Sequence, residues 1–235
     1  MALGYADTYL PEDEPLLAAR ASAEDLGGSV PIRPVTGAVL RFLAAAIGAR
    51  TVVEIGTGCG SSGIWLLRGM RPDAVLTSVD VEPEYQRMAR KAFAQAGFAS
   101  NRYRLILGRA LDVLPRLSDG AYDMVFCDAD TREYPDYLEA ALRLLRAGGI
   151  VAFDDAIAGG MGGADGTKGL TGADDLVSAG GLVSADDLVS AEGQGWQAGN
   201  TTAAGELAEL LRGDERLVPL FLPVGNGILA AVKRS

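Results

Sequence analysis

The residue pattern with the clearest chemistry is a glycine-rich run followed, one strand later, by a carboxylate. The apolar start of Thr51–Gly60 leads into alternating glycines, and a second apolar run, Leu76–Asp80, ends in an acid. This order suits a nucleoside-bearing cofactor at the carboxyl ends of two neighbouring parallel strands. Glycine lets the backbone approach a ligand without a Cβ, and Asp80 could accept hydrogen bonds from two ribose hydroxyls. The pattern therefore predicts a nucleoside cofactor.

Two cofactors compete for these glycines. Gly58–Gly63 fits G-x-G-x-x-G, and Asp80 follows at about the 20-residue interval of a dinucleotide site, which would indicate NAD. The longer series Glu54-x-Gly56-x-Gly58-x-Gly60 starts inside the strand and resembles motif I of methyltransferases that use S-adenosyl-L-methionine. We favour this methyl donor because the longer match is more specific. An NAD-dependent oxidoreductase would also need a proton donor such as Tyr-x-x-x-Lys, and Tyr134–Tyr137 lacks the Lys.

Composition excludes several classes of function. The 235 residues include 21 Lys and Arg against 31 Asp and Glu, a formal charge of −10, and no His. An acidic surface repels phosphate backbones, so we expect no nucleic-acid partner. Without His there is no histidine-based triad or zinc site, and any metal must be held by oxygen ligands. Two cysteines (Cys59 and Cys127), no signal-peptide pattern and no apolar run of about 20 residues predict a cytoplasmic protein without a membrane segment.

Segments typical of strands and helices alternate along most of the chain. Two helices are expected within 1–48. The expected strands are 52–55, 75–79, 103–107, 122–127 and 150–153, and the helices between them are 61–69, 83–96, 110–117 and 135–145. Short, nearly all-apolar strands between amphipathic helices predict an α/β fold with a doubly wound, mostly parallel sheet of seven strands. A helix at 202–212 and two strands within 216–233 predict an antiparallel hairpin at the carboxyl end of this single domain, 1–235.

Residues 159–200 interrupt this alternation. They are rich in Gly, Ala, Asp and Ser, and the segment 173–179 recurs as 185–191. One interpretation is a mobile surface loop that arose by tandem duplication. The other is a lid over the substrate, with Trp196 on its apolar underside.

These motifs together resemble the cation-dependent O-methyltransferases, the family of catechol and caffeoyl-CoA methyltransferases and their small bacterial relatives. The likeness runs from about 28 to 157 and resumes from about 201 to 233. Beyond the glycine run, it is carried by Ser78–Asp80, Gly108–Leu114, Tyr122–Asp130, Leu145–Gly149 and Phe153–Asp155. The resemblance implies a class I methyltransferase fold of the Rossmann-like type, S-adenosyl-L-methionine as cofactor, a small phenolic or catechol-like acceptor, and a homodimer.

The resemblance also assigns site residues. It places at the cofactor Ile32, Glu54, Gly56, Thr57, Gly58, Ser62, Asp80, Ala110, Leu111 and Asp128. Asp128 would also be the first ligand of a divalent cation, Mg²⁺ before Ca²⁺ or Mn²⁺, with Asp154 and Asp155 as the other ligands. Independently of the family, these acids end consecutive predicted strands and should share one edge of the sheet. Their mutual repulsion there requires a cation or protons.

Two positions depart from the family pattern. Asp155 stands where the family has Asn, and it remains an oxygen ligand. Thr131 stands where the family has a Lys that serves as base or orienter for the accepting hydroxyl. Either the metal alone lowers the pKa of that hydroxyl, or Lys168 in the insertion replaces the catalytic Lys. The third alternative is a cofactor-binding protein of the methyltransferase fold in which catalysis is lost or altered.

Overall fold

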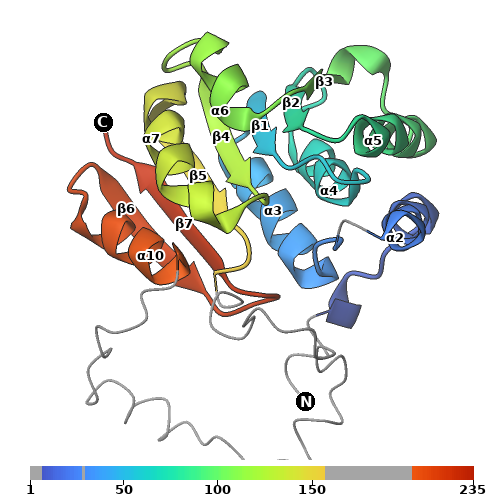
Figure 1. The fold of residues 1–235 in the computed structure, drawn as a ribbon, viewed down its shortest axis with the longest axis horizontal. Coiled ribbons are helices and arrows are strands. Elements are labelled where there is room, and N and C mark those ends of the chain that lie inside the picture. Colours follow the sequence, from blue (N-terminus) through green and yellow to red (C-terminus); the bar gives the residue numbers. More distant parts are fainter. Residues whose placement is uncertain (1–6, 28–29, 157–202) are drawn as a thin grey trace, which may run out of the picture.

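A seven-stranded sheet forms the centre of the protein (Figure 1). The computed structural model describes residues 7–27, 30–156 and 203–235. The strands are β1 (Thr51–Ile55), β2 (Val75–Asp80), β3 (Tyr103–Leu107), β4 (Tyr122–Cys127), β5 (Leu145–Phe153), β6 (Leu217–Leu222) and β7 (Ile228–Lys233), in the spatial order β3-β2-β1-β4-β5-β7-β6. Strands β1 to β5 are parallel, whereas β7 is antiparallel to both β5 and β6. The predicted doubly wound sheet with a carboxyl-terminal antiparallel hairpin is confirmed.

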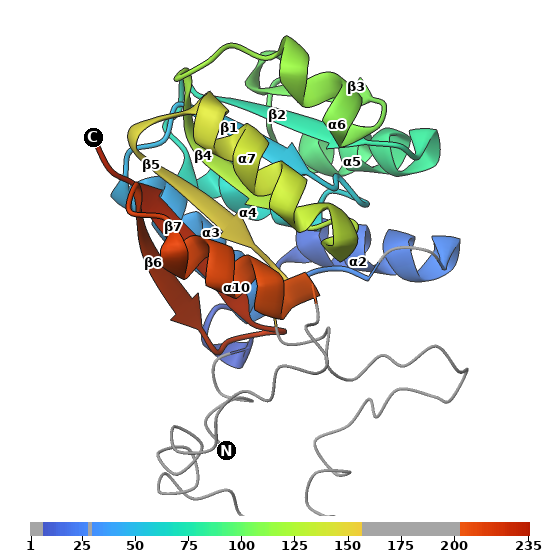
Figure 2. The same ribbon diagram turned by 60° about the vertical axis from the view of Figure 1, so that its left-hand side comes forward.

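Helices cover both faces of this sheet (Figure 2). The helices are α2 (Glu14–Leu26), α3 (Pro34–Ala46), α4 (Ser61–Gly69), α5 (Pro83–Gln95), α6 (Ala110–Val113), α7 (Tyr134–Leu144) and α10 (Ala203–Gly213). Helices α2 to α5 bury apolar side chains on one face, with Val52 among the strand residues there. Helices α6, α7 and α10 cover the other face, with Val53. Neighbouring strand residues therefore belong to opposite cores, which explains why these strands are apolar at nearly every position.

Most predicted segments have their counterpart within a few residues, but two differ for clear reasons. The helix expected at 110–117 ends at Val113 and continues as a 3-10 turn, Leu114–Arg116, because Pro115 has no N–H for the next α-helical hydrogen bond. Strand β5 begins at Leu145 rather than Ile150. Tyr122 pairs with Leu145 and Met124 with Ile150, so the pairing contains an irregularity, and the glycines within it concealed the early start of the strand.

Helices α3 and α4 cross at very short range because small residues lie at the crossing. A Cβ on Gly37 would stand 2.3 Å from the indole ring of Trp65. A Cβ on Gly69 would stand 2.3 Å from the carbonyl oxygen of Arg41. Helix α3 can therefore lie close to α4, and this fixes the segment before α3 over the edge of the sheet.

None of the helices in the described ranges combines the length and the apolar character that a membrane span requires.

Strand order also determines where a ligand can bind. From β1 the chain proceeds outward to β2 and β3, then returns to place β4 on the other side of β1. The loops after β1 and β4 consequently leave the sheet in opposite directions and open a crevice at its carboxyl edge, which is the usual binding place in open α/β sheets.

Candidate functional site

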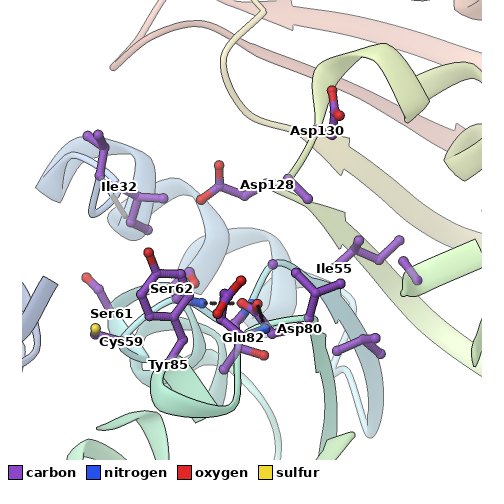
Figure 3. Close-up of a pocket in the computed structure, with 18 of the residues that line it drawn as sticks. Ile32, Ile55, Cys59, Ser61, Ser62, Asp80, Glu82, Tyr85, Asp128 and Asp130 are labelled. Carbon is purple, nitrogen blue, oxygen red and sulfur yellow. Dashed lines mark hydrogen bonds between the residues drawn. The ribbon is translucent and has the colours of Figure 1, made fainter. Parts of the chain in front are cut away.

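A cavity of about 540 Å³ lies at this carboxyl edge (Figure 3). Its volume is within the range of sites for small molecules and cofactors. Of the residues selected from the sequence, those that line it are Ile32, Gly56, Thr57, Gly58, Ser62, Asp80, Ala110, Asp128 and Asp155. They come from the segment before α3, the loop after β1 with the start of α4, the start of α6, and the ends of β2, β4 and β5. In Figure 3 the carboxylate of Asp128 points toward the side of the cavity that Ile32 borders.

The glycine loop after β1 is fixed by close backbone contacts. Gly56 has a φ of 93°, and a Cβ there would stand 1.9 Å from the carbonyl oxygen of Asp128. Gly56 N–H donates to the carbonyl of Val79 at 2.9 Å, and Asp128 N–H donates to that of Ile55 at 2.8 Å. Only glycine tolerates both the positive φ and this approach. The loop is therefore held between the ends of β2 and β4 before any ligand binds.

Asp80 connects the glycine loop to β2. Its Oδ2 accepts the backbone N–H groups of Thr57 (2.9 Å) and Gly58 (3.0 Å), and its Oδ1 accepts that of Glu82 (2.9 Å). The predicted ribose-binding residue thus also organises the loop beside it. A carboxylate offers about four lone-pair sites, so Asp80, which lines the cavity, retains acceptor capacity beyond these three hydrogen bonds.

Glu54 lies beneath the loop rather than in the cavity. It is 0% exposed, its Oε2 accepts the hydroxyl of Ser78 at 2.5 Å, and the Ser78 hydroxyl meets that of Thr57 at 2.7 Å. Its other oxygen, Oε1, is buried without a hydrogen-bond partner. Burial raises the pKa of Glu54 to about 7, although hydrogen bonds from Ser78 and Ser62 oppose the shift. Glu54 therefore supports the loop from below, whereas the resemblance placed it among the residues at the cofactor.

Three carboxylates end β4 and β5 at the same edge. Asp128 is partly exposed, and its pKa is raised well above the usual range by burial and by the nearby Asp154 and Asp155. Asp154 is 2% exposed, and burial together with Asp155 raises its pKa to about 7. Its Oδ1 has no hydrogen-bond partner. The predicted repulsion within this acidic edge, defined as Asp128, Asp154 and Asp155, is therefore present.

The acidic edge does not form a ready-made metal site. Within the described ranges, no group of three or more His, Cys, Asp or Glu residues could hold a metal ion as the side chains stand. Asp155 adopts a φ of 58°, and its Oδ1 accepts a hydrogen bond from Asn226 at 2.8 Å. Asn and Asp tolerate this left-handed backbone better than other non-glycine residues, so Asp155 can adopt the same conformation as the Asn of the family pattern. The cation ligands stay a prediction.

Other sequence-based assignments fall outside the cavity. Leu111 packs against the core under α6 and α7 instead of lining it. Asp154 lies behind the lining. Lys168 lies outside the described residues, as does the duplicated segment. Thr131 begins a 3-10 turn, Thr131–Glu133, that leads into α7.

A hydrogen-bonded group that the sequence analysis did not select lines the cavity beside Ala110. Glu133 Oε2 accepts the hydroxyl of Tyr137 at 2.6 Å, and its Oε1 accepts Nη2 of Arg109 at 2.7 Å. These contacts join the loop after β3 to the start of α7. No spacing in the sequence pointed to them, because Arg109 and Glu133 belong to different β-α connections and meet only in the folded chain.

Comparison with known proteins agrees with this geometry. The sequence pattern of the O-methyltransferase family matches residues 13–234. A "Probable O-methyltransferase" of Mycobacterium tuberculosis is 42% identical over 229 residues, which cover 97% of this chain and 89% of that protein.

Two solved structures resemble the chain over nearly its whole length. The O-methyltransferase TomG from Streptomyces achromogenes, involved in tomaymycin synthesis and solved in complex with SAM, is 26% identical with a TM-score of 0.76 and covers 100% of this chain and 96% of its own. The O-methyltransferase from Bacillus cereus, solved in complex with SAH, is 25% identical with a TM-score of 0.72 and covers 98% and 96%.

Proposed function

The chain belongs to the O-methyltransferase family, and we propose that it transfers a methyl group from S-adenosylmethionine to a hydroxyl of a small phenolic or catechol-like acceptor. Its sheet is that of a class I methyltransferase. Family membership favours the methyl donor over NAD, the other cofactor that the glycine pattern allowed. We treat residues 1–235 as one methyltransferase domain.

One observation carries this proposal: the glycine loop, Asp80 and two residues of the acidic edge, Asp128 and Asp155, border a single cavity. A donor held by Asp80 at its ribose and by the loop at its methionine end would present its sulfonium methyl toward Asp128. An acceptor entering from the side of Ile32 would meet that methyl group. Donor and acceptor would thus be aligned for direct displacement, which supplies much of the rate enhancement in such a reaction.

The reaction needs little further chemistry from the protein. The acceptor oxygen forms a bond to the methyl carbon as the carbon–sulfur bond breaks, which leaves S-adenosylhomocysteine and a methyl ether. The acceptor hydroxyl gives its proton to a base or to solvent water, so that one proton is released for each methyl group transferred. The chain's task is to align the two molecules and to exclude water, and the preorganised loop from Gly56 to Gly60 serves the alignment.

The donor set of the acidic edge suits a hard divalent cation. All its ligands are carboxylate oxygens, and one buried oxygen of Asp154 lacks a partner. The pKa values of Asp128 and Asp154 are raised by burial and, in addition, by the negative charge of the neighbouring carboxylates. Such a cation would stabilise the acceptor oxyanion as a Lewis acid. Its ligands would be Asp128, Asp154 and Asp155, whose side chains would have to turn toward one another.

The described lysines do not supply a base for the proton of the acceptor hydroxyl. The described lysines are Lys91 on α5 and Lys233, and Lys233 donates to the carbonyls of Leu142 and Leu145, away from the cavity. Thr131 cannot accept a proton at neutral pH. The cation or Lys168 would then have to promote deprotonation.

Calorimetry and turnover test the proposal together. S-adenosylhomocysteine should bind and NAD⁺ should not, and the chain with Mg²⁺ should methylate catechols. Asp80→Asn should weaken S-adenosylhomocysteine binding at least tenfold, because it removes the charge that holds both loop and ribose. The exposed Asp73→Asn is the matched control. Binding of NAD⁺ alone would refute the proposal, and tight cofactor binding without turnover on a broad phenol panel would favour a non-catalytic binding protein.

We also propose a homodimer, and the edge strand β6 offers a surface for it. Apolar side chains that are about half exposed lie on both faces of β6: Val218 and Leu220 on one face and Phe221 on the other, at 48%, 49% and 48%. Arg234 N–H donates to Arg216 O at 2.7 Å. Because hydrogen-bonded pairs alternate along an antiparallel ladder, the even-numbered residues of β6 bond to β7, and the backbone groups of odd-numbered residues such as Pro219 face away from β7. Since Pro219 has no N–H, this edge is poorly suited to strand addition. A partner would pack on the side chains instead.

A further inference from the structure

The turn between β6 and β7 lies beside the end of β5. It comprises residues 224–227 and is closed by a hydrogen bond from the N–H of Gly227 to the carbonyl of Val224 at 2.9 Å. Gly225 and Gly227 have φ values of 61° and 88°, which glycine adopts without strain. A Cβ on Gly225 would stand 2.2 Å from the hydroxyl oxygen of Thr36, in the first turn of α3. The turn is therefore packed directly against α3.

Two hydrogen bonds join this turn to the residues that follow β5. Nδ2 of Asn226 donates to Oδ1 of Asp155 at 2.8 Å, and the N–H of Ala156 donates to the carbonyl of Gly227 at 3.0 Å. Among the described residues, Asp155 is the one non-glycine position with a positive φ, 58°. A residue keeps such a conformation where its surroundings determine it, and such positions cluster at functional sites. The turn thus fixes both the backbone and the carboxylate of Asp155.

The amide of Asn226 suits a role toward a cation held by Asp155. Asp155 lines the cavity together with Asp128, whereas Asn226 lies outside the lining. A carboxylate has two oxygens, so Oδ2 of Asp155 can meet a cation while Oδ1 stays bonded to the amide. An amide orients the carboxylate without cancelling its charge, whereas an ammonium or guanidinium group would offset that charge and compete with the cation. Carboxylates that bind metals are commonly held by a hydrogen bond of this kind.

We propose that Asn226 is a positioning residue for the divalent cation: it fixes the carboxylate of Asp155 so that the free oxygen serves as a ligand. The carboxyl-terminal hairpin thereby sets the affinity of the acidic edge for the cation. This inference rests on the proposed function and deepens its cation site. Without the amide, the side chain of Asp155 would sample several orientations, and cation binding would have to select one of them.

Binding of Mn²⁺ to the full chain measures this role without turnover. Mn²⁺ accepts the same oxygen ligands as Mg²⁺, and its free concentration can be followed by electron paramagnetic resonance. Asn226→Ala should weaken Mn²⁺ binding about tenfold or more. The affinity of this variant for S-adenosylhomocysteine, measured by calorimetry in EDTA, should equal that of the wild type. Asn101→Ala, at an exposed position of the 3-10 turn Ser100–Arg102, is the matched control and should change neither affinity.

Exchange of the two side chains tests the contact itself. In the double variant Asp155→Asn with Asn226→Asp, the amide at position 155 can donate to the carboxylate at position 226 and keep its own oxygen for the cation. The formal charge is unchanged, and Asn also tolerates the left-handed backbone. The double variant should therefore bind Mn²⁺ more tightly than Asn226→Ala does. Asn226→Gln, which displaces the amide by one methylene, should also weaken binding and is the second single variant if Asn226→Ala does not fold.

The outcomes separate this inference from the proposed function. Wild-type affinity for Mn²⁺ in Asn226→Ala or, if that variant does not fold, in Asn226→Gln would overturn the inference and leave the proposed cation intact. A double variant that binds Mn²⁺ no better than the single variant would overturn it too, because Asn226 would then not act through Asp155. Equal losses of Mn²⁺ and S-adenosylhomocysteine affinity would indicate a general structural effect and contradict it. A wild type that binds S-adenosylhomocysteine but not Mn²⁺ would refute the cation itself and this inference with it.

Discussion

Replacing Glu54 by Gln should flatten the pH dependence of stability. Glu54 is 0% exposed, and only one of its carboxylate oxygens has a hydrogen-bond partner. Its ionised form is therefore poorly solvated in the folded protein. Gln keeps the shape of the side chain and a carbonyl acceptor for Ser78, but it cannot titrate.

The magnitude follows from the pKa shift. Burial raises the pKa of Glu54 from 4.5 to about 7, and each pKa unit corresponds to about 1.4 kcal/mol. Because the folded pKa is raised, the folded state binds the proton more tightly than the unfolded state does. The contribution to stability is complete below pH 4.5 and is lost as pH rises through 7. The wild type should lose about 3 kcal/mol of unfolding free energy over that window through this residue.

Urea unfolding at a series of pH values between 5 and 8.5 measures this loss. The difference in unfolding free energy between Glu54→Gln and wild type should change by about 3 kcal/mol in favour of the variant as pH rises. A pH-independent cost of burying the new amide would change the difference in unfolding free energy by the same amount at every pH. It would therefore leave the dependence of that difference on pH unchanged. Glu139→Gln, at an exposed position of α7, is the control. Parallel stability profiles for Glu54→Gln and wild type would refute the reasoning.

Further predictions address packing, cofactor, cation and assembly. Gly37→Ala should destabilise the protein by about 1–3 kcal/mol in thermal unfolding, because its Cβ would stand 2.3 Å from an indole ring. Gly213→Ala, where a Cβ meets nothing within 4 Å, should not. EDTA should abolish methyl transfer, and so should Asp128→Ala; full activity in EDTA would contradict the cation. If β6 forms a dimer interface, Leu220→Glu should shift the mass measured by light scattering from dimer to monomer, whereas a monomeric wild type would exclude the homodimer.

The local patterns of this chain were sufficient for its architecture. Strands buried on both faces must be apolar throughout, and the amphipathic helices between them repeat at helical spacing, so both could be predicted. The glycine loop could be predicted for a similar reason. The backbone of Gly56 approaches the carbonyl of Asp128 so closely that only glycine fits there. A contact of this kind can therefore be recognised in the sequence as a glycine. The irregular start of β5 could not be predicted, because it depends on pairing with Tyr122 across the sheet.

What only the tertiary structure decided are the contacts between residues of different β-α connections. The sequence predicted that Asp128, Asp154 and Asp155 would share an edge, since parallel strands end together. It could not predict that Asn226 would hold Asp155 or that Arg109, Glu133 and Tyr137 would join two loops. Periodicity determines which way a side chain faces along its own element, whereas its partners depend on the twist of the sheet and the packing of neighbouring loops.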